Sequence, residues 1–402
     1  MLVAHKIRLN QNNKQQTFFE KCAGTARFSY NWALDQWKES YNVGNKPQEA
    51  KLRVLLNKVK YEEFAWMQEV PKSVIQQSIK DLGAAYHNAF RRIKQNKKTD
   101  NQKNPFGFPV YKKKFKNDSF RVDNGPPVKG LNAILVKGKK VKIPKLGWVK
   151  LSESIRFPGQ IKSTTISRQA SNWFISFLID TVDIIPTKKT QGSVGVDLGV
   201  KSLAVLSNGE VVEGPKAHKN ALKKLRKWNK KYSRTKKGSG NRKKVAKQLG
   251  KLHYKITCIR QDSLHKLTSR LAKDFKIIGI EDLNVSGMVK NHNLARAISD
   301  CGFGEFKRQL EYKAAWYGSK LFVANCWFPS TKTCSVCGHI QDMPLNKRIF
   351  TCDSCKIKIN RDKNAAINLE NLAVSSTDNK NDCGDESSGS KAIDSFDRNY
   401  CL

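Results

Sequence analysis

The chain has 402 residues, enough for two or three domains, and its 75 lysines and arginines outnumber its 34 aspartates and glutamates to give a formal net charge of +41. Ordinary soluble domains manage with a net charge of about 2–8 in magnitude, so this excess predicts a standing polyanionic partner, namely nucleic acid. No apolar run approaches the ~20 residues that span a bilayer, and the N-terminal segment lacks a signal-peptide core. We therefore expect a cytoplasmic, nucleoid-associated protein without a membrane partner.

The first 182 residues predict a β domain that carries a helical insertion. Residues 1–10 predict a short strand, and residues 118–182 predict short alternating strands separated by Gly, Pro and Ser-Asn, so together they are expected to form a small barrel. Between them, residues 11–117 predict three helices, the last of which begins after Pro71.

The end of this insertion, residues 94–117, is basic, polar and interrupted by proline and glycine. Two interpretations remain open. Its basic residues could contact phosphates while its aromatic side chains stack on bases. Alternatively, the segment is a solvated linker that the aromatic residues anchor to the protein. The aromatic residues in question are Phe106, Phe108, Tyr111 and Phe115.

After a linker at 183–192, two apolar strands joined by a turn precede a strongly basic region. Residues 215–261 contain eighteen lysines and arginines and no acidic residue. A solvated helix face usually mixes both signs of charge, so this region predicts a pair of helices that lies on nucleic acid. Helices at 262–275 and 301–318 alternate with strands, and residues 371–402 predict a disordered tail because they are rich in Ser, Asn and Asp.

Four of the ten cysteines form two closely spaced pairs, Cys334-x-x-Cys337 and Cys352-x-x-Cys355, with fourteen residues between the pairs. Each short turn brings two thiolates within reach of one ion, so the pattern predicts a four-cysteine zinc ribbon that holds one structural Zn²⁺. The other six cysteines are expected to be free thiols in a reducing compartment.

Three acidic residues follow apolar strands or open a helix. Asp197 ends the apolar run VGVD, Glu281 ends IIGIE, and Asp362 opens the helix of NRDKNAAINL. Each alone has an ordinary explanation: a turn residue, a salt bridge and a helix N-cap, respectively. Together they predict a catalytic site that binds two Mg²⁺ or Mn²⁺ ions, because a carboxylate at the end of a buried strand needs a compensating cation. Asp282 is the competing ligand beside Glu281.

Five motifs together resemble the TnpB family, the insertion-sequence-encoded relatives of the type V CRISPR effectors, from near residue 5 to about 370. They are GVDLGVKSLAV, IGIEDLNVSGM, ISDCGFGEFKRQLEYKAAWYGSKL, FPSTKTCSVCGH and NRDKNAAINL. The resemblance implies that Asp197, Glu281 and Asp362 form a catalytic triad. One departure lies in the segment 358–362, which reads KINRD where the family often has a histidine.

The resemblance also implies an α+β multidomain fold. An RNase H-like (RuvC) α/β nuclease domain would span 183–330 and 357–370, with the zinc ribbon, a target nucleic-acid-loading module, at 331–356. A wedge β-barrel at 1–10 and 118–182 would carry a helical recognition domain at 11–117. The expected partners are a guide RNA from the transposon end, with one protein chain per RNA, and a double-stranded DNA target that is cut next to a short flanking motif.

The helix after Pro71 supplies candidates for reading that flanking motif. Lys72, Gln76 and Lys80 recur every four residues on one face. Glutamine can pair with adenine in the major groove, and lysine can donate to guanine or to phosphate. A solvated polar face is the alternative.

Three other functions compete with a guided endonuclease. A catalytically silent RNA-guided DNA-binding protein would be expected to lose one or more of the three acids, which this chain keeps. A directly acting serine or tyrosine recombinase would need a nucleophile in an arginine cluster, and no residue stands out as one. A zinc-ribbon nucleic-acid-binding accessory protein of transposition would need no catalytic site.

Overall fold

The computed structural model describes residues 1–99, 107–124, 133–182, 191–344 and 346–378. The chain divides into two compact units. The first comprises Met1–Asp183 and Trp228–Tyr254, and the second comprises Ile184–Lys227 and Lys255–Leu402. We call them the N-terminal and C-terminal units. Within the described ranges, no helix combines the length and the apolar character that crossing a membrane requires.

A seven-stranded sheet with the order β2-β6-β7-β1-β5-β4-β3 forms the frame of the N-terminal unit. Its first strand has alternating burial, so Val3, Ile7 and Leu9 face the core while their neighbours face solvent. This strand pairs antiparallel with both β7 and β5, as expected for an opening strand that joins a later β domain. Closure of this sheet into a barrel stays a prediction. The strands are β1 (Leu2–Asn10), β2 (Ser119–Asp123), β3 (Leu135–Lys137), β4 (Lys140–Ile143), β5 (Gly147–Leu151), β6 (Gln160–Gln169) and β7 (Asn172–Asp180).

The helical insertion of this unit packs on the sheet through a shared apolar core. A capping box fixes the start of the first helix, since Asn12 and Gln15 exchange side-chain to backbone hydrogen bonds of 2.9 and 3.0 Å. Trp37 and Tyr86 stack with their ring centroids 4.3 Å apart and join the first and third helices. The helices are α1 (Asn13–Asn42), α2 (Glu49–Val59), the 3₁₀ turn η1 (Ala65–Glu69) and α3 (Lys72–Thr99).

The aromatic residues of the 94–117 segment contact protein wherever they are described. The Phe108 ring lies 5.9 Å from Phe90, and the Tyr111 hydroxyl donates a hydrogen bond to Asp35. The Arg168 guanidinium lies over the Phe115 ring. Phe108, Tyr111 and Phe115 nevertheless stay 53%, 44% and 66% exposed, so the anchored linker and the stacking surface both stay predictions. Phe106 lies outside the described residues.

A five-stranded sheet with the order β10-β9-β8-β11-β12 forms the centre of the C-terminal unit. Its three strands β8, β11 and β12 are parallel, and β9 and β10 add an antiparallel edge. The parallel strands are apolar on both faces because helices cover both sides. The strands are β8 (Gln191–Leu198), β9 (Ala204–Leu206), β10 (Val211–Val212), β11 (Phe275–Glu281) and β12 (Lys320–Ala324).

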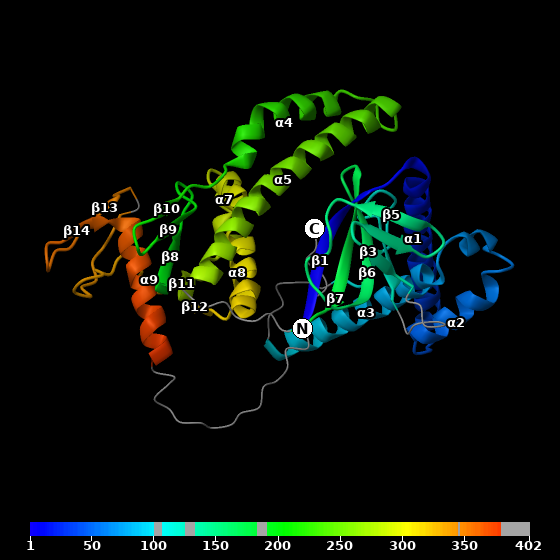
Figure 1. Cartoon of the computed structure of the whole chain (residues 1–402), viewed down its shortest axis with the longest axis horizontal. Helices are drawn as coiled ribbons and strands as arrows, with labels where there is room; N and C mark the ends of the chain where they lie inside the picture. The colour runs from blue at the N-terminus through cyan, green and yellow to red at the C-terminus, as the bar shows by residue number, and fades with distance from the viewer. Residues whose placement is uncertain (100–106, 125–132, 183–190, 345, 379–402) are drawn as a thin grey trace, which may run out of the picture. The chain divides into compact units, whose positions relative to one another are not determined.

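Helices α8 (Phe303–Tyr317) and α9 (Arg361–Asp378) lie on opposite sides of this sheet (Figure 1). Val194, Ile278 and Ile280 form one buried core with apolar residues of α8 and of the long helix α5 (Gly240–Asp274). The basic region therefore continues without a break into the helix expected at 262–275. The remaining helices are α4 (Ala217–Ser233), α6 (Val285–Met288) and α7 (Ala295–Cys301), and a hairpin is formed by β13 (Ile349–Thr351) and β14 (Lys358–Asn360).

The predicted tail boundary at residue 371 is wrong. Helix α9 continues to Asp378, because Ala373 still packs in the interior with 1% of its surface exposed. The rest of the predicted tail, residues 379–402, lies outside the described residues.

Candidate active site and zinc ribbon

Asp197 and Glu281 lie at matching positions on two neighbouring parallel strands. Val196 of β8 and Ile280 of β11 are register partners, and each acid is the next residue along its strand. Because side chains alternate along a strand, the two carboxylates project from the same face of the sheet. That face is the one covered by α9.

Two glycines allow α9 to approach this face unusually closely. Gly195 and Gly279 are register partners, each two residues before an acid. A Cβ atom on Gly195 would lie 1.8 Å from the carbonyl oxygen of Ala366, and one on Gly279 would lie 2.3 Å from that of Leu369. Since Asp362 lies one helical turn before Ala366, this close packing brings the third acid to the ends of β8 and β11.

The three carboxylates share one electrostatic environment. Burial raises the pKa of Asp197 to about 7, with further contributions from the negative charges of Asp362 and Glu281, while Arg361 opposes the shift. Burial also raises the pKa of Glu281, and a hydrogen bond from Ser330 opposes that shift. Asp197 and Glu281 therefore resist ionisation, and a bound cation would stabilise their charged forms.

Asp362 is paired with two arginines. Arg361 donates to its Oδ1 from Nη2 at 2.8 Å and from Nε at 3.1 Å, and Arg348 Nη1 lies 3.6 Å from its Oδ2. In the described ranges, the one group of three or more side chains close enough to share a metal ion is that of the four cysteines, and the three carboxylates do not form such a group. Asp282, the competing ligand, pairs with Lys307 at 2.6 Å and is 51% exposed, which supports Glu281 as the inward acid.

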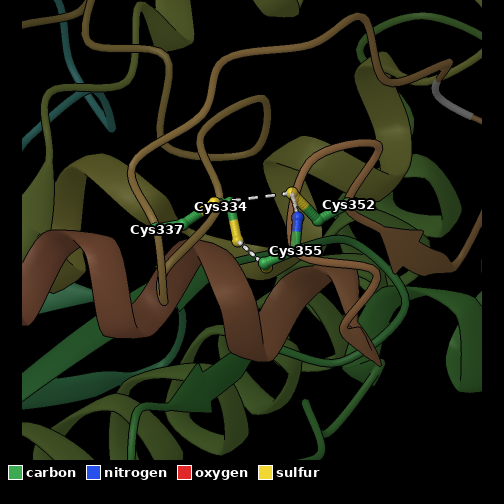
Figure 2. A group of neighbouring side chains, drawn as sticks. All are labelled: Cys334, Cys337, Cys352 and Cys355. Carbon is green, nitrogen blue, oxygen red and sulfur yellow. Dashed lines mark hydrogen bonds between the residues drawn. The ribbon is translucent and has the colours of Figure 1, made fainter.

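The four predicted zinc ligands converge from two knuckles (Figure 2). Cys334 and Cys355 have their sulfur atoms 3.6 Å apart, and so have Cys337 and Cys352. A tetrahedron with Zn–S bonds of about 2.3 Å has edges of roughly 3.8 Å, so the arrangement fits one four-coordinate zinc ion. Gly338 has φ +75°, which lets the first knuckle turn back.

Of the six other cysteines, Cys22, Cys258, Cys301 and Cys326 are free thiols. Cys383 and Cys401 lie outside the described residues.

The basic helices α4 and α5 present exposed lysines over much of their length. Asp300 caps the start of α4, where its carboxylate accepts hydrogen bonds from the backbone N–H groups of His218 and Lys219 at 3.0 and 3.2 Å. The capping carboxylate stabilises the helix start and so supports the basic surface that follows it. The exposed lysines include Lys223, Lys224, Lys227, Lys230, Lys243, Lys244, Lys247 and Lys251.

The flanking-motif candidates lie near the start of α3. Lys72 and Lys80 are exposed, and Gln76 is half-buried. The adjacent Gln77 is buried and hydrogen-bonds to Asp123 and Arg121, so its side of α3 is not available to a ligand. Base reading by the three candidates stays a prediction.

Sequence reasoning did not single out the polar residues that surround the acids. Ser330, Asn364 and Asn368 are buried and hydrogen-bonded beside the site, and Arg361 and Arg348 neutralise Asp362. Two asparagines four residues apart among the apolar residues of α9 were the available signal, because a helix seldom buries such side chains without partners.

Comparison with known proteins places this geometry in a family. A protein of Streptomyces pristinaespiralis, provisionally named an RNA-guided DNA endonuclease, is 34% identical over 388 residues, which cover 95% of this chain and 91% of the relative. InsQ of Escherichia coli K12, named in the same way, is 32% identical over 386 residues, which cover 92% of this chain and 91% of InsQ. The TnpB-like protein L79 of a mimivirus of Acanthamoeba polyphaga is 30% identical over 49% of this chain and 40% of its own length. The chain belongs to the TnpB family.

Family profiles divide this TnpB chain into three matched regions. Residues 176–292, which contain Asp197 and Glu281, match the family described as "Probable transposase". Residues 303–369, which contain the four cysteines and Asp362, match a "Cas12f1-like, TNB domain". Residues 1–46 match a "Helix-turn-helix domain", although here they form strand β1 and the single long helix α1.

The fold of this TnpB chain is also that of a solved CRISPR effector. The Cas12f1 chain in a cryo-EM complex with sgRNA and target DNA aligns with a TM-score of 0.53 over 89% of this chain and 83% of that one. At 17% sequence identity, the similarity shows a common mixed α/β fold.

Proposed function

We propose that this TnpB-family chain is an RNA-guided DNA endonuclease whose catalytic acids are Asp197, Glu281 and Asp362. The observation that carries the proposal is the shared environment of these acids, in which burial and neighbouring charge raise the pKa of Asp197 to about 7. Structural ion pairs would lower such a pKa, whereas a site prepared for divalent ions raises it until the ions bind. The endonuclease names of relatives that align along more than nine-tenths of this chain support the same activity.

Two Mg²⁺ or Mn²⁺ ions would be held by the three carboxylates, whose hard oxygen atoms suit these cations, and would supply an activated water and stabilise the leaving oxygen of a phosphodiester. The backbone positions the three ligands. The parallel strands β8 and β11 hold Asp197 and Glu281 side by side, and Asp362 comes from α9, which packs on the same face of the sheet. Arg361 and Arg348 balance the negative charge of Asp362 and add positive charge where a phosphate would approach.

One Zn²⁺ would be held by Cys334, Cys337, Cys352 and Cys355, and its role would be structural. Four thiolate ligands leave no open position for a water or a substrate. The knuckles lie between the second and third acids in the chain, so the ion would fold the segment that leads into α9.

The partners would be a guide RNA derived from the transposon end, with one chain per RNA, and a double-stranded DNA target beside a short flanking motif. The net charge of +41 and the acid-free residues 215–261 support a polyanion bound along α4 and α5. We further propose the domain roles implied by the family: a wedge barrel with its helical recognition insert, a RuvC-like nuclease domain and a target nucleic-acid-loading ribbon. Such a protein would act in the cytoplasm, beside the nucleoid.

The test is cleavage of a plasmid that carries the sequence complementary to RNA copurified with the protein. The plasmid also carries a randomised flanking segment, and Mg²⁺ is present. Asp197→Asn should reduce cleavage to below about a thousandth of the wild-type rate, because the ions stabilise charge that develops in the transition state. Its guided binding should remain nearly unchanged, since ground-state affinity comes from base pairing and backbone contacts.

Asp282→Asn is the matched control, because it removes a neighbouring carboxylate that already pairs with Lys307. It should cut at close to the wild-type rate. Guided binding by the wild type without any cleavage would replace the proposal with a silent RNA-guided binder. Cleavage that persists in Asp197→Asn would overturn the assignment of the acids.

A further inference from the structure

Ser330 links the zinc ribbon to the second acid. Its hydroxyl donates a hydrogen bond of 3.0 Å to Oε1 of Glu281, and only 2% of the residue is exposed. It lies in the loop four residues before Cys334, the first cysteine of the ribbon. The orientation of the Glu281 carboxylate therefore depends on where this loop lies.

Two asparagines of α9 hold the same loop. Asn368 Nδ2 donates to the carbonyl oxygens of Ser330 and Thr333 at 2.8 and 2.7 Å. Asn364 Nδ2 donates to the carbonyl oxygen of Thr333 at 2.7 Å, and its Oδ1 accepts from the N–H of Ser335 at 2.9 Å. Both asparagines are buried, at 6% and 0% exposure, so a shift of the loop would leave buried polar groups without partners.

These bonds join two acids that come from separate elements. Asp362 is on α9, two residues before Asn364, and Glu281 is at the end of β11. The path from one to the other runs through the ribbon loop and its backbone carbonyls. Like charges on the acids repel one another, so fixed donors are needed to keep the carboxylates facing a common point.

We propose that Ser330 is a positioning residue for Glu281 and that Asn364 and Asn368 couple the zinc knuckle to the carboxylate site. The divalent-ion affinity of that site then depends on an intact knuckle. The inference rests on the proposed function, because it takes the three acids as the ligands of those ions. It assigns the ribbon a second role, that of a brace between two acids, in addition to folding its own segment.

The test is a titration of the full-length protein with Mn²⁺ followed by electron paramagnetic resonance, with zinc content measured on the same samples. Asp197→Ala supplies the background from ions held by nucleic acid. Ser330→Ala should retain about one zinc per chain while its Kd for site-bound Mn²⁺ rises about tenfold, the usual effect of losing a residue that orients a ligand. The Mg²⁺ concentration for half-maximal cleavage should rise by a similar factor, and excess Mg²⁺ should restore the rate.

Two serine variants separate positioning from packing. Ser330→Thr keeps the hydroxyl and should recover most of the wild-type Mn²⁺ affinity. Ser335→Ala is the matched control in the same loop, because its buried hydroxyl has no hydrogen-bond partner in the described structure, and it should bind Mn²⁺ like the wild type.

Two further variants test the link to the ribbon. Asn368→Leu removes the two hydrogen bonds that Asn368 Nδ2 donates to the loop and keeps a branched side chain with the same number of heavy atoms, and it should weaken Mn²⁺ binding about tenfold or more. Cys352→Ser should lose zinc and weaken Mn²⁺ binding together.

The outcomes distinguish the inference from the proposed function. If Asp197→Ala binds as much Mn²⁺ as the wild type, the carboxylates are not the site and the proposed function fails. If Asp197→Ala loses the ions but Ser330→Ala and Asn368→Leu bind them as tightly as the wild type, the brace is overturned and the catalytic site stands.

Discussion

Asp197 is the residue of the candidate site whose pKa leads to the clearest predictions. Burial and the carboxylates of Asp362 and Glu281 raise its pKa to about 7, so below that pH a divalent ion must displace a proton. The apparent Mg²⁺ affinity should therefore fall about tenfold for each pH unit below 7. The same shift affects folding. Between about pH 4 and 7 the folded chain keeps a proton that the unfolded chain has lost, so stability without Mg²⁺ should decrease as the pH rises through this window.

Asp197→Asn should remove that loss of stability. At pH 8 and without Mg²⁺, the variant should be more stable than the wild type by about 2–4 kcal/mol, and the difference should disappear near pH 4. Melting temperatures across this range, measured in metal-poor buffer without chelator so that zinc stays bound, would check it. Asp282→Asn should follow the wild type. A stability difference that does not change with pH would mean that Asp197 is not the titrating group.

At the same scale, the sequence was sufficient to propose the three acids and insufficient to describe their surroundings. An acid after an apolar strand stands out because burial without compensation is costly, and this made Asp197 and Glu281 visible. Ser330 had no such signal. Its contact with Glu281 spans 49 positions of the chain and exists only because the loop, β11 and α9 meet.

The contact between β8, β11 and α9 is the element-scale feature on which the site depends. Gly195→Ala would place a methyl group 1.8 Å from the carbonyl oxygen of Ala366 and 2.6 Å from the backbone nitrogen of Glu370. Backbone atoms cannot move alone, so α9 would shift and carry Asp362 with it. The variant should lose about 1–3 kcal/mol of stability and at least about tenfold in Mg²⁺ affinity.

Gly192→Ala is the control for this substitution. Gly192 lies on the same strand with nothing within 4 Å of an added Cβ, so its replacement should leave both quantities close to the wild type. Melting temperatures and Mg²⁺-dependent cleavage of the two variants would decide. A Gly195→Ala protein as stable and as active as Gly192→Ala would show that the close approach is not needed.

Periodicity predicted where the helices and strands lie, and their packing required the structure. The repeated Gly-x-acid spacing in β8 and β11 was present in the sequence. A glycine in a strand has several explanations, however, and the close approach of α9 could be seen only in the structure. The predicted start of the tail at residue 371 was wrong for a related reason. Residues 371–378 look polar and loop-like, but Ala373 finds a buried position and the helix continues.

At the scale of the whole molecule, the net charge of +41 has to be balanced by a partner. Self-repulsion between excess lysines destabilises the free chain, and the proposed RNA would remove it while releasing counterions from the phosphates. Helices α4 and α5 concentrate the charge without any acid between residues 215 and 261, so they should supply a large part of the RNA affinity.

Replacing Lys223, Lys230, Lys244 and Lys247 with glutamine should therefore weaken RNA binding and flatten its salt dependence. Each lost phosphate contact should lower the slope of log Kd against log salt by about 0.7–0.9, so four contacts would lower it by roughly 3. The measurement is binding of the copurified RNA to full-length protein from low to moderate salt. The four Lys→Arg substitutions keep the charge and should keep the slope. An unchanged slope in the glutamine variant would place the RNA on another surface and leave this basic region to the DNA.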